Sequence, residues 1–229
     1  MQSRDGDDER CIKTIRGHDF PRDKRRAYTR RMRYAHDVGF LTVAEYLRLE
    51  ADGEVRHEYV AGTTYAMTGA TQRHSRLSLN IAMRLRERAL ASGCEVFLND
   101  LKVRAADDVF YYPDVVVACG PLNDEAVFVE APCCIVEVTS ASTRRIDRRE
   151  KLQAYLAMSS VNAYLIVDQR RHRMEAHLRD AHGAWDRLEC TIGDSITLAC
   201  IGYTLSLAHV YEGVSVSTVN EPEPEVYDA

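Results

Sequence analysis

Several features that would mark a special class of protein are missing from this sequence of 229 residues. No apolar run approaches the roughly 18–20 residues that a membrane-spanning helix needs, and no apolar segment of the signal-peptide type follows the first residues. The seven cysteines are odd in number and include no CxxC pair, which argues against a structural zinc site and a disulfide framework. We therefore expect a globular, cytoplasmic protein that binds no membrane, in which Cys133 and Cys134 are small buried residues.

The net charge of −5 is unevenly distributed and divides the chain into three parts. Residues 1–36 hold 11 Lys/Arg against 6 Asp/Glu, whereas residues 212–229 hold five acidic residues and no basic one. Both ends lack apolar periodicity, so we expect a disordered basic leader, a folded domain at residues 37–211 and an acidic tail. The leader could be an arm that grips nucleic acid. It could also be an extension that the native protein lacks, because Met32 could start a shorter chain.

The hydrophobic pattern of the middle part predicts both helices and strands. Leu77, Ile81 and Leu85 recur every four residues and predict a long helix. Thr42 and Glu45 have the spacing of a capping box and predict the start of a shorter one. We expect helices at residues 42–50, 72–92, 147–158 and 206–211, a hairpin or two short strands at 57–67, and strands at 95–104, 109–118, 131–139, 163–168, 173–178 and 184–190. This order predicts a fold that combines helices and strands (α/β in the broad sense), with an α+β arrangement in which helices flank a mixed sheet.

Two acidic residues stand at unusual places in the expected strands. Glu137 lies inside the apolar run Cys133–Val138, where a carboxylate is unfavourable unless a cation, a metal or a proton compensates it. Asp114 follows Pro113 and opens the apolar run Val115–Val117. If the two strands are neighbours, the carboxylates can converge on a hard divalent cation such as Mg²⁺. The alternative is that Asp114 satisfies a turn and Glu137 pairs with a nearby arginine.

The same residues belong to an ordered string of motifs. Tyr112-Pro113-Asp114 is followed by Glu137-Val138-Thr139-Ser140, and this pair resembles the PD-(D/E)XK nuclease motif. The other segments that carry the resemblance are Thr42–Leu47, His57–Gly62, Ala66–Ala70, Asn99–Arg104, Tyr111–Val117, Ile135–Thr143, Ala163–Asp168 and Leu205–Gly213, with His74, Asn80, Asp147, Lys151 and Tyr155 between them. From about residue 39 to 215 the chain is similar to a large, mostly uncharacterised bacterial restriction endonuclease family of that superfamily. The resemblance implies a restriction-endonuclease-like core and a metal-dependent endonuclease that hydrolyses the phosphodiester bonds of DNA.

The resemblance also implies roles for single residues. Asp114 and Glu137 would hold Mg²⁺ or Mn²⁺, which polarises a phosphate oxygen and lowers the pKa of the attacking water. A lysine normally stands two residues after the glutamate, but this sequence has Thr139 there. Two lysines are candidates to replace it, and each could instead be a solvated surface residue. Lys151 lies in the helix that follows the motif, and Lys102 lies on a strand that we expect to pair with the Asp114 strand.

Further residues are candidates for the site or for contacts with nucleic acid. Glu58 is a candidate third carboxylate, with capping or a salt bridge as the alternative. His74, Arg73, Arg144 and Arg145 are candidate contacts to the DNA backbone. A capping or packing role for His74 and a solvated face for the arginines are the alternatives.

Two other functions stay open beside the DNA endonuclease. The missing lysine also fits an inactive nuclease fold that serves as an interaction module, and an RNA-directed nuclease would use the same residues. The acid pair favours activity, because an inactive site has no need for an unfavourable buried acid. We expect DNA as the partner and leave a homodimer open.

Overall fold

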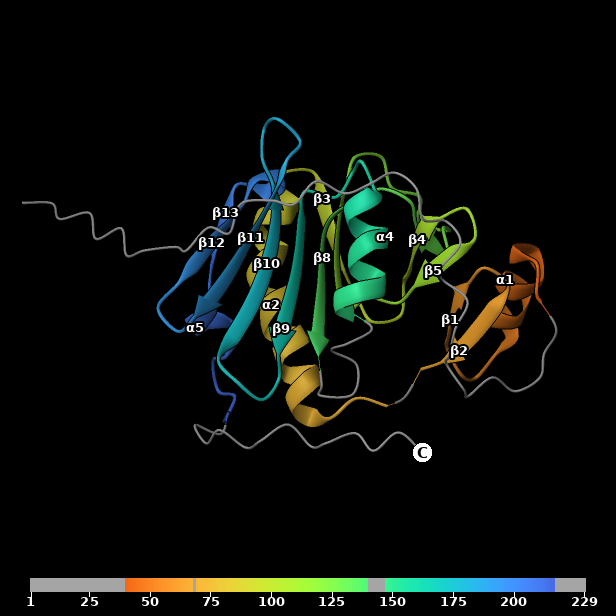
Figure 1. Ribbon diagram of the computed structural model, residues 1–229, viewed down its shortest axis with the longest axis horizontal. Helices are drawn as coiled ribbons and strands as arrows, with labels where there is room; N and C mark the ends of the chain where they lie inside the picture. Colours follow the sequence, from red (N-terminus) through yellow and green to blue (C-terminus); the bar gives the residue numbers. More distant parts are fainter. Residues whose placement is uncertain (1–39, 68, 140–146, 217–229) are drawn as a thin grey trace, which may run out of the picture.

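The computed structural model describes residues 40–67, 69–139 and 147–216, in which three β-sheets combine with helices (Figure 1). The helical elements are α1 (Val43–Asp52), α2 (Gln72–Ala91), the π-helix η1 (Asp147–Lys151), α4 (Leu152–Ala157), the 3-10 helix η2 (Ala199–Ile201) and α5 (Leu207–Val210). The strands are β1 (His57–Val60), β2 (Thr63–Ala66), β3 (Cys94–Leu98), β4 (Lys102–Ala106), β5 (Val109–Tyr111), β6 (Val115–Cys119), β7 (Phe128–Val129), β8 (Pro132–Thr139), β9 (Ala163–Asp168), β10 (Arg173–Arg179), β11 (Trp185–Thr191), β12 (Ser195–Leu198) and β13 (Tyr203–Ser206). The mixed α+β class expected from the sequence is confirmed.

A six-stranded sheet with the order β11-β10-β9-β8-β6-β3 lies between α2 and α4. β8 and β9 are parallel, and the other neighbours are antiparallel. Leu77 of α2 shares one core with Val117 and Val136, whereas Tyr155 of α4 shares the other core with Ile135. Because helices cover both faces, every residue of β8 is buried. A carboxylate on this strand is therefore surrounded by protein.

A five-stranded sheet with the order β2-β1-β5-β4-β7 lies beside the six-stranded one and supports α1. Tyr46 of α1 stacks on Tyr59 of β1, with ring centroids 4.7 Å apart, and both rings pack against Phe110. The predicted capping box is confirmed, because Glu45 N–H donates to Thr42 Oγ1 and Thr42 N–H donates to the Glu45 carboxylate. The third sheet, β12-β13, completes the core on the α2 side.

Two of the expected strands are each divided by a turn, which corrects the sequence prediction. The strand expected at 95–104 divides into β3 and β4, which belong to different sheets, at a bend where Asn99 has a φ of 51°. The strand expected at 109–118 divides into β5 and β6 at Pro113, which has no N–H to donate to a ladder. Lys102 therefore lies on β4, which pairs with β7 and with β5, the first part of the strand expected to carry Asp114, whereas β6, directly after Asp114, pairs with β3 and β8.

The helix expected at 147–158 is present, but its first turn is the π-helix η1, and α4 continues it from Leu152. A π-turn bonds residue i to residue i+5 and is common at functional sites. Lys151 is the last residue of this turn. The long helix expected at 72–92 corresponds to α2, and the short helix expected at 206–211 corresponds to α5.

Cys94 and Cys119 form a disulfide, so the expectation from cysteine spacing is wrong for this pair. The two residues face each other in the antiparallel register of β3 and β6. The two cysteines are 25 residues apart in the sequence, and β4 and β5 lie between them. This spacing therefore does not reveal that β3 and β6 pair. Cys133 and Cys134 are buried thiols, as expected.

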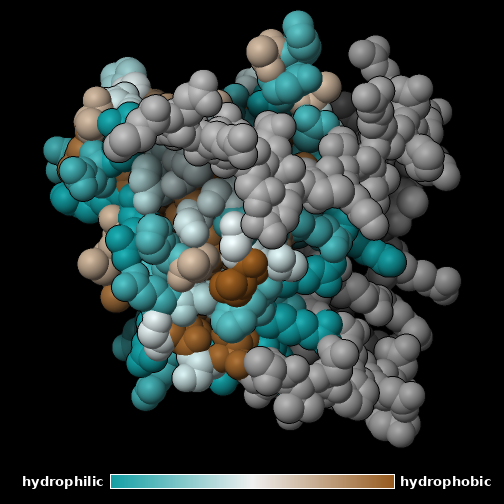
Figure 2. Space-filling view, turned by 90° about the vertical axis from the view of Figure 1, so that its left-hand side faces the viewer, coloured by the Kyte–Doolittle hydropathy of each residue, from teal (hydrophilic) through white to brown (hydrophobic). Residues whose placement is uncertain are grey.

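In the described part of the chain, no helix is both long and apolar enough to cross a bilayer. Figure 2 shows the face of the molecule at the β12–β13 end. Outside the grey atoms, this face is mostly hydrophilic, and hydrophobic residues form small separate spots.

Candidate active site

Asp114 and Glu137 meet at the carboxyl end of β8. In the antiparallel register of β6 and β8, Val115 lies opposite Val136. The paired register ends at these two residues, and Asp114 lies in a bend one residue before β6. Asp114 Oδ2 also accepts a hydrogen bond of 2.6 Å from the backbone N–H of Val138. The Asp114 carboxylate therefore contacts the backbone of the residue that follows Glu137.

Glu137 lies on the α4 face of the sheet and is 5% exposed. Its Oε1 atom accepts hydrogen bonds from Lys151 Nζ at 3.0 Å and from the Tyr155 hydroxyl at 3.3 Å. Burial raises the pKa of Tyr155 well above its ordinary value, and the negative charge of Glu137 adds to this shift. Tyr155 thus remains a neutral phenol that can donate to the carboxylate.

Lys151 joins Glu137 to the third candidate carboxylate. Its ammonium lies 2.9 Å from Glu58 Oε1, and its side chain is 8% exposed. The Glu58 atom also accepts a hydrogen bond of 3.2 Å from the backbone N–H of Tyr112, so β1 is anchored beside the start of β6. The structure brings Glu58, Glu137 and Lys151 together, although 79 residues separate Glu58 from Glu137 in the sequence.

His74 is a partner of Asp114. Its Nε2 atom lies 2.7 Å from Asp114 Oδ1, and the two side chains are 18% and 13% exposed. The N-cap Thr71 positions this first turn of α2, because its hydroxyl accepts from His74 N–H and donates to Gln169 after β9. The sequence analysis missed Thr71 and Gln169. For Thr71, the available signal was its place directly before the expected helix, where threonine is a preferred N-cap residue. Arg73 is exposed on the same turn.

Lys102 lies in a different environment, which sequence reasoning missed. Its ammonium is 5.3 Å from the centre of the Tyr112 ring, and burial lowers the pKa of Lys102. Tyr112 in turn donates a hydrogen bond of 2.6 Å to the buried Glu50, which also contacts His57 at 3.0 Å. This network supports the segment that precedes Asp114.

The arginine candidates divide into two groups. Arg144 and Arg145 lie outside the residues that the structure describes. The neighbouring Arg149 and the more distant Arg170 are exposed, whereas Arg173 is held by Glu189 at 2.7 Å. Contacts with DNA stay a prediction for Arg73, Arg144 and Arg145.

The donors at this site suit a hard divalent cation. Glu58 and Glu137 both contact the Lys151 ammonium, whereas Asp114 contacts His74. Each Asp114 oxygen accepts one of the described hydrogen bonds, and a carboxylate oxygen has two lone pairs. Within the described ranges, no group of three or more His, Cys, Asp or Glu side chains is close enough to form a complete metal site. Two carboxylates fit Mg²⁺ in particular, because this ion usually completes its shell with water and substrate phosphate.

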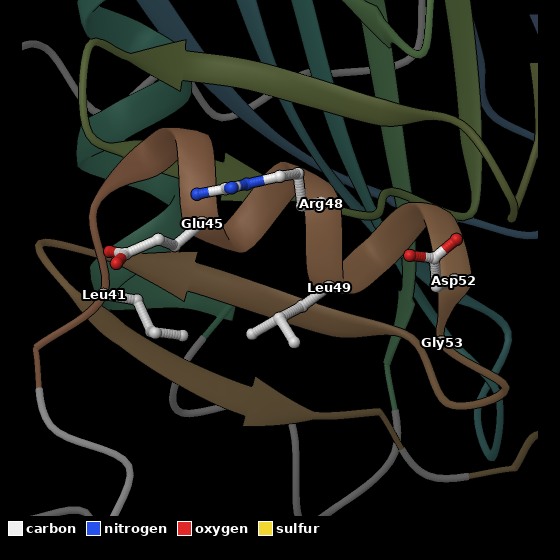
Figure 3. Close-up of a pocket in the computed structure, with 6 residues that line it drawn as sticks. All are labelled: Leu41, Glu45, Arg48, Leu49, Asp52 and Gly53. Carbon is white, nitrogen blue, oxygen red and sulfur yellow. The ribbon is translucent and has the colours of Figure 1, made fainter.

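A separate pocket of about 500 Å³ opens at α1 (Figure 3). It is lined by Leu41, Glu45, Arg48, Leu49, Asp52 and Gly53. Leu41 and Leu49 lie below the helix in this view, whereas Glu45, Arg48 and Asp52 lie above them along the helix (Figure 3). The pocket contains none of the candidate catalytic residues, so its size does not identify it as the active site.

Comparison with known proteins agrees with this geometry. Residues 43–208 match the Uma2 family, which is described as "Putative restriction endonuclease". The chain belongs to this family, so the resemblance found in the sequence is confirmed. The uncharacterized protein slr1290 of Synechocystis is 30% identical over 177 residues, which are 76% of this chain and 93% of that protein. A second uncharacterized Synechocystis protein, sll1609, is 30% identical over 149 residues, which are 63% of this chain and 84% of that protein.

A solved structure shares the fold. It is described as a "putative nuclease" from Anabaena variabilis and aligns with a TM-score of 0.64 at 14% sequence identity. The alignment covers 76% of this chain and 99% of that chain. At this identity the likeness shows the fold, and it confirms the restriction-endonuclease-like architecture.

Proposed function

We propose that the protein is a metal-dependent endonuclease that hydrolyses phosphodiester bonds of DNA, with Mg²⁺ or Mn²⁺ as its cofactor. The observation that supports this most is the buried Lys151 between Glu58 and Glu137, next to Asp114. A buried carboxylate is unfavourable without compensation. Glu137 is buried, and Glu58 and Asp114 are partly buried near the same strand end, which supports a site kept for chemistry in a chain of this family.

The residues have separate roles in this proposal. Asp114 and Glu137 hold the metal ion, which when bound polarises a phosphate oxygen and lowers the pKa of the attacking water. His74 orients Asp114, and Tyr155 orients Glu137, each through a hydrogen bond to one carboxylate oxygen. Lys151 supplies the positive charge that stabilises the negative charge developing on the phosphate, in place of the lysine absent at Thr139.

The first turn of α2 supports binding of a phosphate backbone. Arg73 is exposed there, beside His74, which contacts Asp114. The N-terminus of this 20-residue helix carries partial positive charge, which favours phosphate. Arg144 and Arg145 remain proposed contacts to DNA, and a homodimer and a cytoplasmic location remain expectations.

A second function is favoured by one observation. Lys151 is held by two carboxylates and 8% exposed, so its charge is already compensated within the protein. Such a lysine could also be purely structural, and the chain would then be an inactive nuclease fold that serves as an interaction module.

Plasmid cleavage separates these functions. The purified full chain is incubated with supercoiled plasmid and, in parallel, with RNA, in Mg²⁺, Mn²⁺ or EDTA. We expect nicked and linear plasmid with either metal, and intact plasmid with EDTA or with the Asp114→Asn variant. Asp186→Asn is the matched control, because Asp186 is exposed on β11 at the far edge of the sheet. Intact plasmid under all conditions would favour the interaction module, and cleavage of RNA alone would identify an RNA-directed nuclease.

A further inference from the structure

Four cysteines from four elements gather at the end of the six-stranded sheet that is opposite to the candidate active site. Cys94 of β3 and Cys119 of β6 are joined by the disulfide. Cys133 of β8 lies next to this bond, with its sulfur 3.4 Å from that of Cys119. Cys200 of η2 extends the series, with its sulfur 2.6 Å from that of Cys133. We call these four residues the sulfur cluster.

The arrangement favours thiol chemistry over metal binding. Two of the four sulfurs are bonded to each other, so four thiolates are not available for a tetrahedral metal ion. The described residues include no group of cysteines that could hold a metal ion. The sulfurs instead form a series of contacts from the disulfide through Cys133 to Cys200, and such proximity of a thiol to a disulfide is what exchange requires.

The protonation of the two thiols is also suited to exchange. Cys133 S–H donates to the sulfur of Cys200, and this hydrogen bond raises the pKa of Cys133 and lowers the pKa of Cys200. Burial raises the pKa of Cys133 further. Cys200 is partly exposed, whereas Cys94 and Cys133 are buried. Cys200 can exchange protons with water because it is partly exposed, and its sulfur lies where it can take up the proton that Cys133 must lose before it reacts.

We propose that the sulfur cluster is a thiol–disulfide exchange site, in which the disulfide moves between the Cys94–Cys119 pair and the Cys133–Cys200 pair and reacts with small thiols at Cys200. The exchange replaces a link between β3 and β6 by a link between β8 and η2. β6 begins directly after Asp114, and β8 carries Glu137. The site therefore determines which of the strands at the acid pair is cross-linked.

The reaction balances without an external oxidant. Cys133 transfers its proton to Cys200, and its thiolate attacks the sulfur of Cys119. The Cys119–Cys133 bond forms, the Cys94–Cys119 bond breaks, and Cys94 leaves as a thiolate that takes up a proton. Cys200 loses its proton to water and attacks Cys133, which forms the Cys133–Cys200 bond and releases Cys119 to be protonated. One disulfide has replaced another.

Reaction with a small thiol continues from this product. A thiolate such as that of glutathione attacks the accessible sulfur of Cys200, forms a mixed disulfide with it and releases Cys133 as a thiolate. A second glutathione thiolate attacks the glutathione sulfur of the mixed disulfide, which frees Cys200 and yields glutathione disulfide. Two electrons and two protons have then passed from two glutathione molecules to the pair of cysteines.

The test follows the position of one disulfide in the full chain. All samples carry Cys11→Ser, because Cys11 lies outside the described residues. Protein with one disulfide per chain is freed of reductant, kept without oxygen, and alkylated in acid at successive times. Peptide mass spectrometry then locates the bond. We expect the Cys133–Cys200 peptide to appear as the Cys94–Cys119 peptide declines by an equal amount, and faster at higher pH, because the attacking species are thiolates.

Two variants complete the test. Cys200→Ser should keep the Cys94–Cys119 bond throughout the incubation and should lose the glutathione adduct at this site. Cys190→Ser is the matched control, because Cys190 is a buried thiol of β11 outside the sulfur cluster, and it should redistribute the bond like the parent chain. Circular dichroism verifies that both variants are folded. A Cys94–Cys119 bond that stays in place in the parent chain, or glutathione reduction at the same rate in Cys200→Ser, would overturn the proposal.

Discussion

Replacement of Lys151 by methionine tests the candidate active site most directly. The ammonium lies 3.0 Å from Glu137 and 2.9 Å from Glu58, and its removal leaves two carboxylates without this cation. Removal of one partner from a buried ion pair costs about 3–5 kcal/mol of unfolding free energy. Glu58 is 18% exposed and keeps some hydration, so we expect about 3 kcal/mol. A protein of this size should then melt about 6–12 °C lower.

The same change should affect catalysis and metal binding in opposite directions. Loss of the charge that stabilises the reacting phosphate should lower metal-dependent cleavage by on the order of 10²–10³-fold. The two carboxylates released from Lys151 should hold a cation more tightly, so Mg²⁺ should raise the melting temperature of Lys151→Met more than that of the parent chain. Lower activity together with a larger metal effect would distinguish a role at the reacting phosphate from a general loss of structure.

The assay compares two lysines of equal burial. Counted over the whole residue, Lys102 and Lys151 are each 6% exposed. Lys102, however, faces the ring of Tyr112. Melting temperatures are measured with and without Mg²⁺, and plasmid cleavage is measured below the melting temperature of the least stable variant. We expect near-parental cleavage by Lys102→Met. Near-parental cleavage and stability of Lys151→Met would refute the assignment of Lys151, and a large loss of cleavage in Lys102→Met alone would transfer the role to Lys102.

Three further predictions concern the surroundings of the site. His74→Ala removes the partner of Asp114 and should weaken Mg²⁺ binding by about 10–100-fold, measured by calorimetric titration, whereas unchanged affinity would remove His74 from the site. Burial lowers the pKa of Lys102 below 10.5, so the folded state loses this proton at lower pH than the unfolded chain. The free energy of unfolding should therefore gain a rising contribution as pH increases toward 10.5, and denaturant titrations should show less of this rise in Lys102→Met. A chain that starts at Met32 should melt at the same temperature as the full chain, and a large decrease would show that the leader stabilises the domain.

Local sequence signals determined the helices and the identity of the acids. The capping box at Thr42 and the four-residue spacing from Leu77 act within one or two helical turns, so they are visible in the sequence and agree with α1 and α2. Glu137 was recognisable because a charged residue inside an apolar run is rare and needs compensation. These signals, together with the resemblance to the family, were sufficient to indicate the mixed fold and the acid pair.

The tertiary structure alone decided which partners these residues have. Lys151 and Lys102 were equivalent candidates in the sequence. The π-turn before α4 places Lys151 at Glu137. The division of the expected strand into β3 and β4 places Lys102 over the ring of Tyr112. The Cys94–Cys119 bond depends in the same way on the register of β3 and β6. Register and sheet membership come from the packing of residues far apart in the chain. A shift of the register by one residue would move every side chain of a strand to the other face of the sheet. For this reason spacing along the sequence could name the candidates but could not pair them.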